Sequence, residues 1–424
     1  MFMMLACIIF ACSLAVQSFQ LPVTRRDVGD DCEALKTTSS SLQMNVLWKN
    51  AKDAIKTSVG LIKNSMHPVV ATPIGFGIVS YLLYIESEYC ITRDMLAVFE
   101  NGRAPDYSNM PVFVERPELE LDLQALMSPD QTDRKYRVII GDEGTGKSTA
   151  TCNAIRSLVP PKAIVYCEVR GSKSFVTDVA NAVGYRISFN PLDRVWRAIN
   201  GEGYSAPPLT WEVLKNRIDA VSRLSTKSLV IVFDSADRLF EEDPEFFLSL
   251  QRDAKAAADH GSPIYIFVLT RGRGLDALRS RSEWSRAAPP FQVGDVSDEQ
   301  AVELLLKQHG TMKRSDAEEA VRTITGGRFH LLNAYPASDS VEENLSMQKK
   351  ITEAGLAEIG LSETHPFFAL LYSSTSKEAL GKDAIRLLGK KQLDKLLEKK
   401  ILSVRADSTY TLNSRHVETF FDGE

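Results

Sequence analysis

A glycine-rich stretch, Gly141 to Thr149, constrains the fold of this chain more than any other sequence feature. It reads Gly-Asp-Glu-Gly-Thr-Gly-Lys-Ser-Thr, follows the apolar run 136–140 and leads into the helical pattern of residues 150–155. A strand, a glycine-rich turn and a helix in this order are the setting of a Walker A phosphate loop. Glycines let the backbone curl so that successive N–H groups point into one anion-sized hollow, and the helix N-terminus adds partial positive charge. The sequence therefore predicts a phosphate-binding loop.

The residues of this loop have distinct expected roles toward a nucleotide. The Lys147 ammonium is expected to lie between the β- and γ-phosphates, and the Ser148 hydroxyl is expected to bind Mg²⁺. We therefore predict ATP and Mg²⁺ as the ligands. The residues expected to hold the nucleotide are Gly141, Asp142, Glu143, Gly144, Thr145, Gly146, Lys147, Ser148 and Thr149.

Composition limits the class of protein. A chain of 424 residues is too long for one ordinary core, so two or three domains are expected. The formal net charge of −5 gives no overall attraction to nucleic acid. Six cysteines occur without a C-x-x-C pair, which argues against a zinc site. Cys152 and Cys167 fall in the predicted core as buried free thiols, which indicates a reducing compartment.

The first 110 residues carry targeting signals. Residues 1–18 are apolar and end in small residues, which indicates a signal peptide or a membrane-targeting leader. Residues 19–110 are predicted to form an N-terminal helical region with an apolar segment at 69–85. That segment is short for a membrane span and is interrupted by Pro73, Gly75 and Gly77, so a buried or membrane-surface helix and a span both stay open.

The leader leaves the compartment open. Secretion or membrane association, through residues 1–18 or 69–85, is one interpretation and a mitochondrial location is another. Because ATP is scarce outside the cell, the nucleotide-binding core is expected in an ATP-containing, reducing compartment.

A second constrained stretch covers residues 228–238. It is a buried-type strand that ends at Asp234, followed by Ser235, Ala236 and Asp237. This is a Walker B arrangement, in which Asp234 is expected to hold Mg²⁺ through water and Asp237 to orient or deprotonate the attacking water. The alternative is a strand end with two solvated carboxylates. Ser235 directly follows Asp234, so Asp237 must serve as the second acid or hydrolysis is slow.

The next strand, predicted at 263–269, ends in polar residues. Thr270 is expected to sense the γ-phosphate from a position between the two central strands, and Arg271 or Arg273 is expected to act as an arginine finger or simply to be solvated. A last core strand is predicted at 291–293. Strands separated by helices predict a mostly parallel sheet covered on both faces, so we expect an α/β core over residues 111–294.

Residues 295–362 predict a small helical lid. Capping boxes at Ser297–Gln300 and Ser315–Glu318 each open a helix, and the second helix ends at Gly326 and Gly327. Arg328 follows at once and is expected to reach back to the nucleotide. The alternative is an exposed arginine at a plain helix end.

Residues 363–424 predict a winged-helix-like domain of three helices and a hairpin over 401–412. Its third helix and flanks are rich in lysine, so a DNA-facing surface is one interpretation. A lysine-rich helix is more often simply solvated, and such units commonly mediate contacts within ATPases. A protein partner is therefore expected here, nucleic acid is not favoured, and a homo-oligomer stays open. The lysines are Lys390, Lys391, Lys395, Lys399 and Lys400.

The motifs over roughly 112–421 resemble the STAND and origin-recognition-like branch of the AAA+ P-loop ATPases. The resemblance rests on Val-Glu-Arg-Pro at 114–117, the loop at 141–149, Asp-Ser-Ala-Asp at 234–237 and Gly-Gly-Arg at 326–328. The same order of motifs is similar to the NTPase domains of crinkler-type effector proteins, although neither a ubiquitin-like header nor a C-terminal nuclease signature is evident.

This resemblance implies an Mg²⁺-dependent ATPase that acts as a switch or motor. ATP binding is expected to bring core and lid together, hydrolysis to release them, and the C-terminal domain to pass the change to a partner. The residues expected to act in catalysis are Lys147, Asp234, Asp237, Thr270, Arg271 and Arg328, with Ser148 and Asp234 on the metal. A non-catalytic nucleotide-binding adaptor or effector is the main alternative, and a P-loop kinase a weaker one.

Overall fold

The structure is a computed structural model that describes residues 87–103, 114, 116–128, 134–158, 163–186, 208–225, 227–261, 263–270, 272–336, 340–373, 378–407 and 409–422. The chain divides into two compact units, residues 1–91 with 187–207 and residues 92–186 with 208–424. Nearly all described residues belong to the second unit. The leader at 1–18, the apolar segment 69–85 and Arg271 lie outside the described residues. Within the described part of the chain, no helix is long and apolar enough to cross a membrane.

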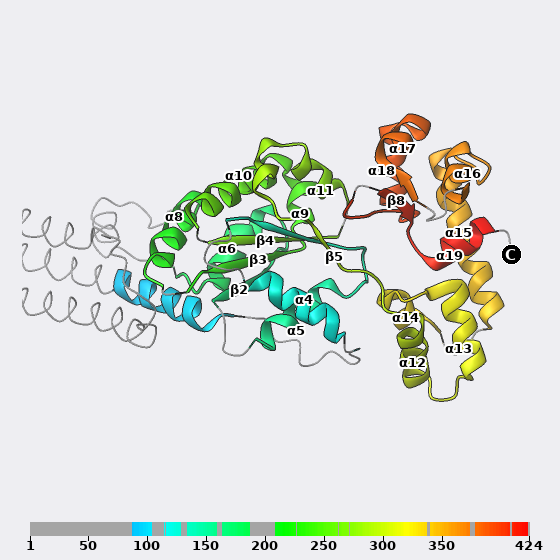
Figure 1. Cartoon of the computed structure of the whole chain (residues 1–424), viewed down its shortest axis with the longest axis horizontal. Coiled ribbons are helices and arrows are strands. Elements are labelled where there is room, and N and C mark those ends of the chain that lie inside the picture. Colours follow the sequence, from blue (N-terminus) through cyan, green and yellow to red (C-terminus); the bar gives the residue numbers. More distant parts are fainter. Residues whose placement is uncertain are drawn as a thin grey trace, which may run out of the picture. The chain divides into compact units, whose positions relative to one another are not determined.

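The second unit is built around a five-stranded parallel sheet with the strand order β2-β3-β4-β1-β5 (Figure 1). The prediction of a mostly parallel α/β core is confirmed. Because β4 lies between β1 and β3, the strand ends that carry the phosphate loop and Asp234 flank the end of β4. The strands are β1 (Arg137–Ile140), β2 (Ile164–Glu168), β3 (Val230–Asp234), β4 (Ile264–Leu269) and β5 (Phe291–Gln292).

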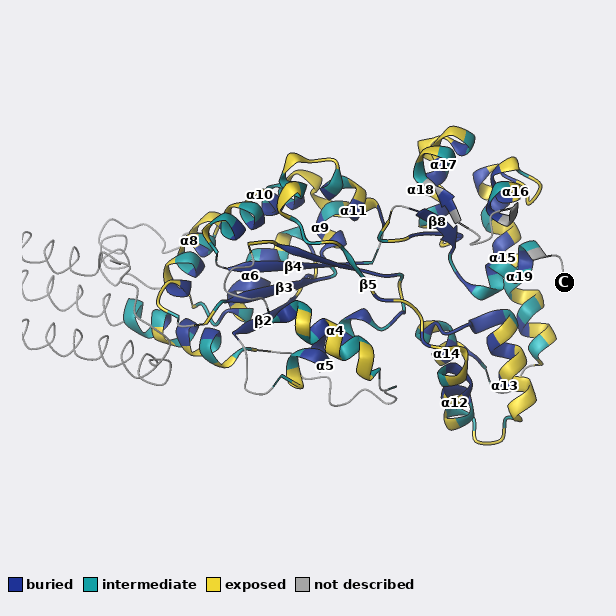
Figure 2. Ribbon diagram, in the orientation of Figure 1, coloured by how far each residue is buried: buried dark blue, intermediate teal, exposed yellow. Residues whose placement is uncertain are grey.

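Helices cover both faces of this sheet, which explains why its strands are apolar on both sides (Figures 1 and 2). On one face, α4 and α5 pack on alternate strand residues that include Tyr166 and Val232. On the other face, aromatic rings of α6 and α10 pack on Phe233 and Phe267. The core helices are α4 (Pro117–Met127), α5 (Lys147–Arg156), α6 (Ser172–Ala182), α8 (Trp211–Ser222), α9 (Asp237–Glu242), α10 (Pro244–His260) and α11 (Gly272–Arg279), with a 3₁₀ turn at Ser282–Arg286.

The start of the core differs from the predicted boundary at residue 111. Residues 92–101 are helical, with Met95 and Phe99 fully buried, and Arg103 forms a bridge to Val165 of β2. Helix α6 begins at Ser172 with Gly171 as its N-cap residue.

The lid contains α12 (Asp298–Gln308), α13 (Arg314–Ala320), a π-helical turn (Val321–Thr325), α14 (Phe329–Ala334) and the long α15 (Val341–Ile359). The capping box at Ser297 and Gln300 is confirmed. The second predicted capping box is wrong, because α13 begins one residue before Ser315 with Lys313 as N-cap, and the Ser315 hydroxyl bonds Asp316 instead. Gly327 is required for close packing, since a Cβ there would lie 1.8 Å from the Val296 carbonyl oxygen.

The C-terminal domain has the predicted winged-helix layout. Three helices and an antiparallel sheet in the order β6-β8-β7 enclose an apolar core to which the end of α15 contributes Leu356 and Ile359. The sequence indicated the hairpin but missed β6 and the last helix, which packs back on the lid through a hydrogen bond from Thr419 to Thr323. The elements are α16 (Pro366–Ser373), β6 (Glu378–Leu380), α17 (Gly381–Leu388), α18 (Lys390–Glu398), β7 (Leu402–Val404), β8 (Thr409–Leu412) and α19 (Arg415–Asp422).

Candidate functional site

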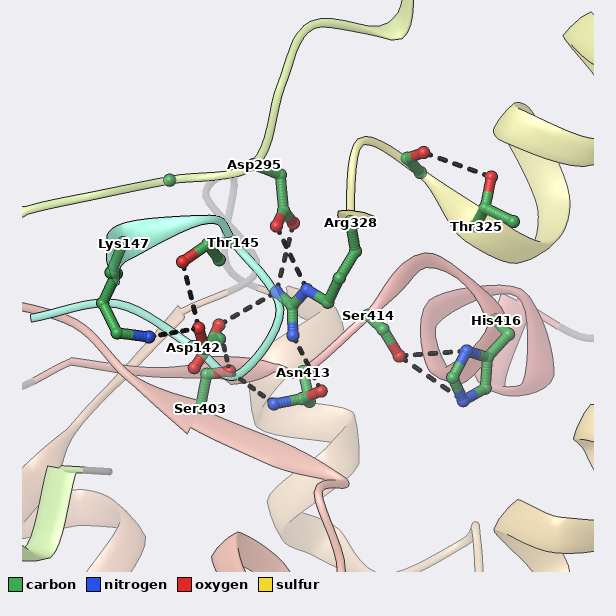
Figure 3. Close-up of polar contacts among 12 residues, drawn as sticks. Asp142, Thr145, Lys147, Asp295, Thr325, Arg328, Ser403, Asn413, Ser414 and His416 are labelled. Atoms are coloured by element: carbon green, nitrogen blue, oxygen red, sulfur yellow. Dashed lines mark hydrogen bonds and ion pairs between the residues drawn. The ribbon is translucent and has the colours of Figure 1, made fainter. Parts of the chain in front are cut away.

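The phosphate loop joins the C-terminal end of β1 to the N-terminus of α5, as the sequence predicted. The main-chain carbonyl of Asp142 accepts hydrogen bonds from the Thr145 hydroxyl at 3.0 Å and from the Lys147 ammonium at 2.6 Å (Figure 3). Ser148 and Thr149 lie in the first turn of α5, where the helix dipole favours an anion. The loop thus has the position between strand and helix that a Walker A loop requires.

Lys147 is the buried cation of this loop, with 6% of its surface exposed. Burial lowers the pKa of its ammonium, and the nearby carboxylates of Asp142, Asp237 and Asp234 act in the opposite direction. Charges interact strongly in a region of low dielectric, so this buried ammonium can serve as a partner for phosphate oxygens. Lys147 is therefore brought together with both acids of the Walker B stretch.

Gly144 permits the approach of the lid to the loop. Its φ of +81° favours glycine, and a Cβ there would lie 2.4 Å from Nδ1 of His330 on α14. Gly261, at the end of α10, is a matched control for a substitution at Gly144, because it has a similar φ of +84° but open space around its Cβ position.

Gly144→Ala should therefore destabilise the protein more than Gly261→Ala. Both changes carry the backbone cost of about 1–2 kcal/mol for a left-handed residue, and Gly144→Ala adds an overpacking cost of about 1–3 kcal/mol. Denaturant unfolding of both variants gives the comparison. Adding His330→Ala to Gly144→Ala should recover the additional loss of unfolding free energy. An equal loss of unfolding free energy in Gly144→Ala and Gly261→Ala would contradict the His330 contact.

The Walker B acids lie at the ends of the central strands. Asp234 is 3% exposed and accepts a hydrogen bond from the hydroxyl of Tyr166 on β2. Asp237 begins α9 and is 7% exposed, and its Oδ1 accepts the main-chain N–H of Thr270 at 3.2 Å. Burial raises the pKa of the Asp237 carboxyl above its ordinary value, with that N–H opposing the shift. The geometry brings the Asp237 carboxylate and the main chain of Thr270 together, and their roles toward a γ-phosphate stay a prediction.

Ser235, between the two acids, adopts a φ of +57°, which is uncommon for a residue other than glycine. This turn lets the N–H of Ala236 donate to the carbonyl of Val268 at 3.0 Å and starts α9 directly at Asp237. The sequence pattern gave no indication of this conformation. Asp237, at the start of α9, supplies the second buried carboxylate.

The oxygen donors at this place fit Mg²⁺. Within the described residues, no cluster of three or more His, Cys, Asp or Glu side chains forms a metal cage. A P-loop magnesium ion does not need one, because phosphate oxygens and water supply most ligands and the protein adds a hydroxyl and a carboxylate. Ser148 and Asp234 are such a pair. Asp234 also lies on the sheet face that α5 covers, since Val230 and Val232 of the same strand pack there.

Arg116, the arginine of the Val-Glu-Arg-Pro motif, has a structural role in the site. Its guanidinium donates to the carbonyl of Thr145 in the phosphate loop at 3.2 Å and to the carbonyls of Gly294 and Asp295. These contacts fix the loop to the segment that leads from the core into the lid. The sequence showed the motif without indicating this function for it.

Arg328 is buried, with 4% of its surface exposed, and lies at the centre of a polar cluster (Figure 3). Its guanidinium binds Asp295 through two hydrogen bonds of 3.1 Å, the Asp142 carboxylate at 3.0 Å and the Asn413 side-chain oxygen at 2.9 Å. Burial lowers the pKa of Arg328, but Asp142 and Asp295 outweigh this effect and hold it above its usual value. The alternative of an exposed arginine at a helix end is wrong.

The C-terminal domain also contacts the phosphate loop, which the sequence did not reveal. The Ser403 hydroxyl of β7 donates to the Asp142 carboxylate at 2.7 Å and accepts a hydrogen bond from Asn413 at 3.0 Å. Lys400 forms an ion pair with Glu143 at 2.7 Å. Arg328, Asp142, Ser403 and Asn413 thus form a closed ring of side chains, which we call the Asp142 ring. A cleft borders it and is lined in part by Asp142, Glu143, Thr270, His330, Lys400, Ser403 and Asn413.

Of the two candidate arginine fingers, the structure describes only Arg273. Arg271 lies outside the described residues, so its role stays a prediction. Arg273 lies in α11 and its guanidinium is 3.9 Å from the Asp394 carboxylate of α18. A second contact joins α11 to the hairpin loop, because Arg279 of α11 donates to the carbonyl of Ala406. Arg273 therefore faces the C-terminal domain of its own chain.

No protein-family model matches this chain, and no curated protein matches it. Among solved structures, the Walker-type ATPase PABY2304 of Pyrococcus abyssi is 14% identical with a TM-score of 0.46, covering 77% of this chain and 99% of that one. Cdc6p of Pyrobaculum aerophilum is 14% identical with a TM-score of 0.38, covering 75% and 97%. The ORC2 protein of Aeropyrum pernix is 12% identical with a TM-score of 0.40, covering 77% and 97%.

These TM-scores lie below 0.5, so the assignment of the fold rests on the strand order and the loop of this chain. A sheet in the order β2-β3-β4-β1-β5, a phosphate loop after β1 and a winged-helix domain after a helical lid define it. The resemblance to crinkler-type NTPase domains rests on sequence motifs alone and stays a prediction. The chain thus has the fold of an α/β P-loop NTPase with a C-terminal winged-helix domain.

Proposed function

We propose that this protein is an Mg²⁺-dependent ATPase that works as a nucleotide switch. Its phosphate loop would bind the β- and γ-phosphates of ATP through main-chain N–H groups and Lys147, with Ser148 and Asp234 holding Mg²⁺. Mg²⁺ would supply charge neutralisation at the phosphates. Asp237 would orient the attacking water and accept its proton, while Thr270 stands next to it.

The observation that carries the switch is the Asp142 ring. Asp142 belongs to the phosphate loop, Arg328 to the lid, and Ser403 and Asn413 to the C-terminal domain, yet their side chains bind one another directly. The Arg328 guanidinium has Asp142 and Asp295 as anionic partners. A γ-phosphate in the adjoining loop offers Arg328 a further, more highly charged partner. Binding and hydrolysis of ATP would thereby change the contacts of both the lid and the C-terminal domain.

The C-terminal domain is the part proposed to pass this change to a protein partner. Of the five lysines on its third helix and flanks, Lys399 pairs with Glu358 at 2.5 Å and Lys400 pairs with Glu143 at 2.7 Å. These two positive charges are directed at acids of the same chain, which supports the preference for a protein partner over DNA.

Hydrogen exchange tests the switch. Amides of α14 and β7 should exchange more slowly with a Mg²⁺-bound non-hydrolysable ATP analogue than with Mg·ADP, because the γ-phosphate binds Arg328 and draws the lid onto the core. The control is Lys147→Ala, which should show the same exchange in both conditions. Nucleotide binding without any difference in α14 or β7 would instead favour the adaptor, in which the nucleotide is structural. Phosphate found on an added acceptor would favour a kinase.

A further inference from the structure

The side chain of Tyr166 makes a contact that the proposed mechanism has not used. Its hydroxyl donates a hydrogen bond of 2.5 Å to Oδ2 of Asp234, and the two residues are 5% and 3% exposed. A hydrogen bond to a carboxylate is stronger than one between neutral groups. The proposed Mg²⁺ ligand therefore has a fixed partner inside the protein.

The register of the sheet explains how Tyr166 reaches Asp234. Strands β2 and β3 are parallel, and Tyr166 lies opposite Val232, two residues before Asp234. Side chains two residues apart point to the same face of a strand, so Tyr166, Val232 and Asp234 share one face. This face is the one that α5 covers. The ring of Tyr166 follows the strand direction, and its hydroxyl meets the carboxylate at the strand end.

The same hydroxyl contacts the helix that follows the phosphate loop. Burial raises the pKa of the Cys152 thiol to about 12, and a side-chain hydrogen bond with Tyr166 opposes this shift. Cys152 lies four residues after Ser148 on α5, so the two side chains lie on the same side of that helix. Tyr166 thus lies beneath the place where Ser148 and Asp234 would share an ion.

We infer that Tyr166 is a positioning residue for the magnesium site, which holds one oxygen of Asp234 so that the other faces the ion's water. This inference rests on the proposed function, because it assigns Tyr166 a part in the Mg²⁺ binding proposed above. Asp234 Oδ2 is occupied by the hydroxyl. The carboxylate therefore cannot rotate freely, and its rotamer is set before the ion arrives. Partners that orient metal ligands in this way contribute about 10–100-fold to metal affinity or activity.

Tyr166→Phe isolates the hydroxyl, because it keeps the ring in the core. The matched control is Tyr265→Phe on β4, since Tyr265 is 1% exposed and its hydroxyl has no hydrogen-bond partner among the described residues. Affinity for a fluorescent ADP is measured in EDTA and across a Mg²⁺ titration. We expect Tyr166→Phe to leave the ADP affinity in EDTA unchanged. It should raise by about 10-fold the Mg²⁺ concentration that gives half of the Mg²⁺-dependent change in ADP affinity. Tyr265→Phe should follow the wild type in both.

A second pair of variants tests whether the effect acts through Asp234. In the Asp234→Asn background, Tyr166→Phe should add no further shift, because the ligand that it positions has lost its charge. A full additional shift there, or an unchanged or tighter Mg²⁺ dependence in Tyr166→Phe, would overturn the inference. A misfolded variant would show a reduced stoichiometry of ADP binding in EDTA, and not a shift in the Mg²⁺ titration. If the wild type binds no ADP at all, the proposed function fails instead.

Discussion

Asp237→Asn is expected to lower ATP turnover by about 10²–10⁴-fold while leaving ADP affinity within about threefold of wild type, because general-base catalysis contributes rate and not binding. The asparagine keeps a side-chain oxygen that can accept the main-chain N–H of Thr270, so the start of α9 should stay in place. What is lost is the carboxylate that receives the proton of the attacking water. Phosphate release and ADP binding, measured on the same preparation, separate these two effects.

The matched control for this change is Asp219→Asn. Burial also raises the pKa of the Asp219 carboxyl, but the charged groups that act on it are Lys215, Arg223, Asp253 and His260, none of which belongs to the site. Asp219→Asn should therefore keep wild-type turnover. A turnover loss of the same size in both variants would show that Asp237 acts on stability alone, and full turnover in Asp237→Asn would remove it from the mechanism.

Arg328→Ala is expected to lower the free energy of unfolding by about 3 kcal/mol, because it leaves partly buried carboxylates without their cation. Asp142 and Asp295 would face each other's charge, and Asn413 would lose its donor. The same variant should abolish the nucleotide-dependent difference in hydrogen exchange of α14 and β7, since the lid loses its contact with the phosphate loop. Denaturant unfolding and hydrogen exchange provide the two measurements.

Arg314→Ala is the control for a lost arginine. Arg314 lies in α13 of the same lid and binds Glu303 and Glu318, but all three side chains are more than half exposed. It should change stability little, because water already solvates such a pair. Arg328→Lys should behave like Arg328→Ala in the exchange measurement, since one ammonium cannot bind Asp142, Asp295 and Asn413 in the geometry of a guanidinium. Wild-type stability in Arg328→Ala would contradict the role of the Asp142 ring.

The sequence predicted those parts of the molecule that local pattern determines. The phosphate loop, the strand ending at Asp234 and the three helices with hairpin all depend on short-range apolar spacing and turn residues, and they were found where expected. The capping box predicted at Ser315 was wrong, because α13 begins at Arg314 with Lys313 as its N-cap residue. A four-residue motif alone does not determine where a helix begins.

The contacts between distant segments could not be predicted in this way. Ser403 is 261 positions from Asp142, and no local pattern specifies that a β7 hydroxyl will bind the phosphate loop. The bond from Tyr166 to Asp234 joins residues 68 positions apart and depends on the register of β2 and β3. Arg328 was expected near the nucleotide, but its partners Asp295 and Asn413 follow only from the packing of lid and C-terminal domain.

The most direct test of the account is phosphate release from ATP by the wild type and by Lys147→Ala, each with Mg²⁺ and with EDTA. Lys147 is the buried cation of the loop, so its loss removes the main side-chain charge that binds the phosphates. The account predicts Mg²⁺-dependent turnover in the wild type, and none above background in Lys147→Ala. A wild-type rate equal to that of Lys147→Ala, or one that persists in EDTA, would contradict it.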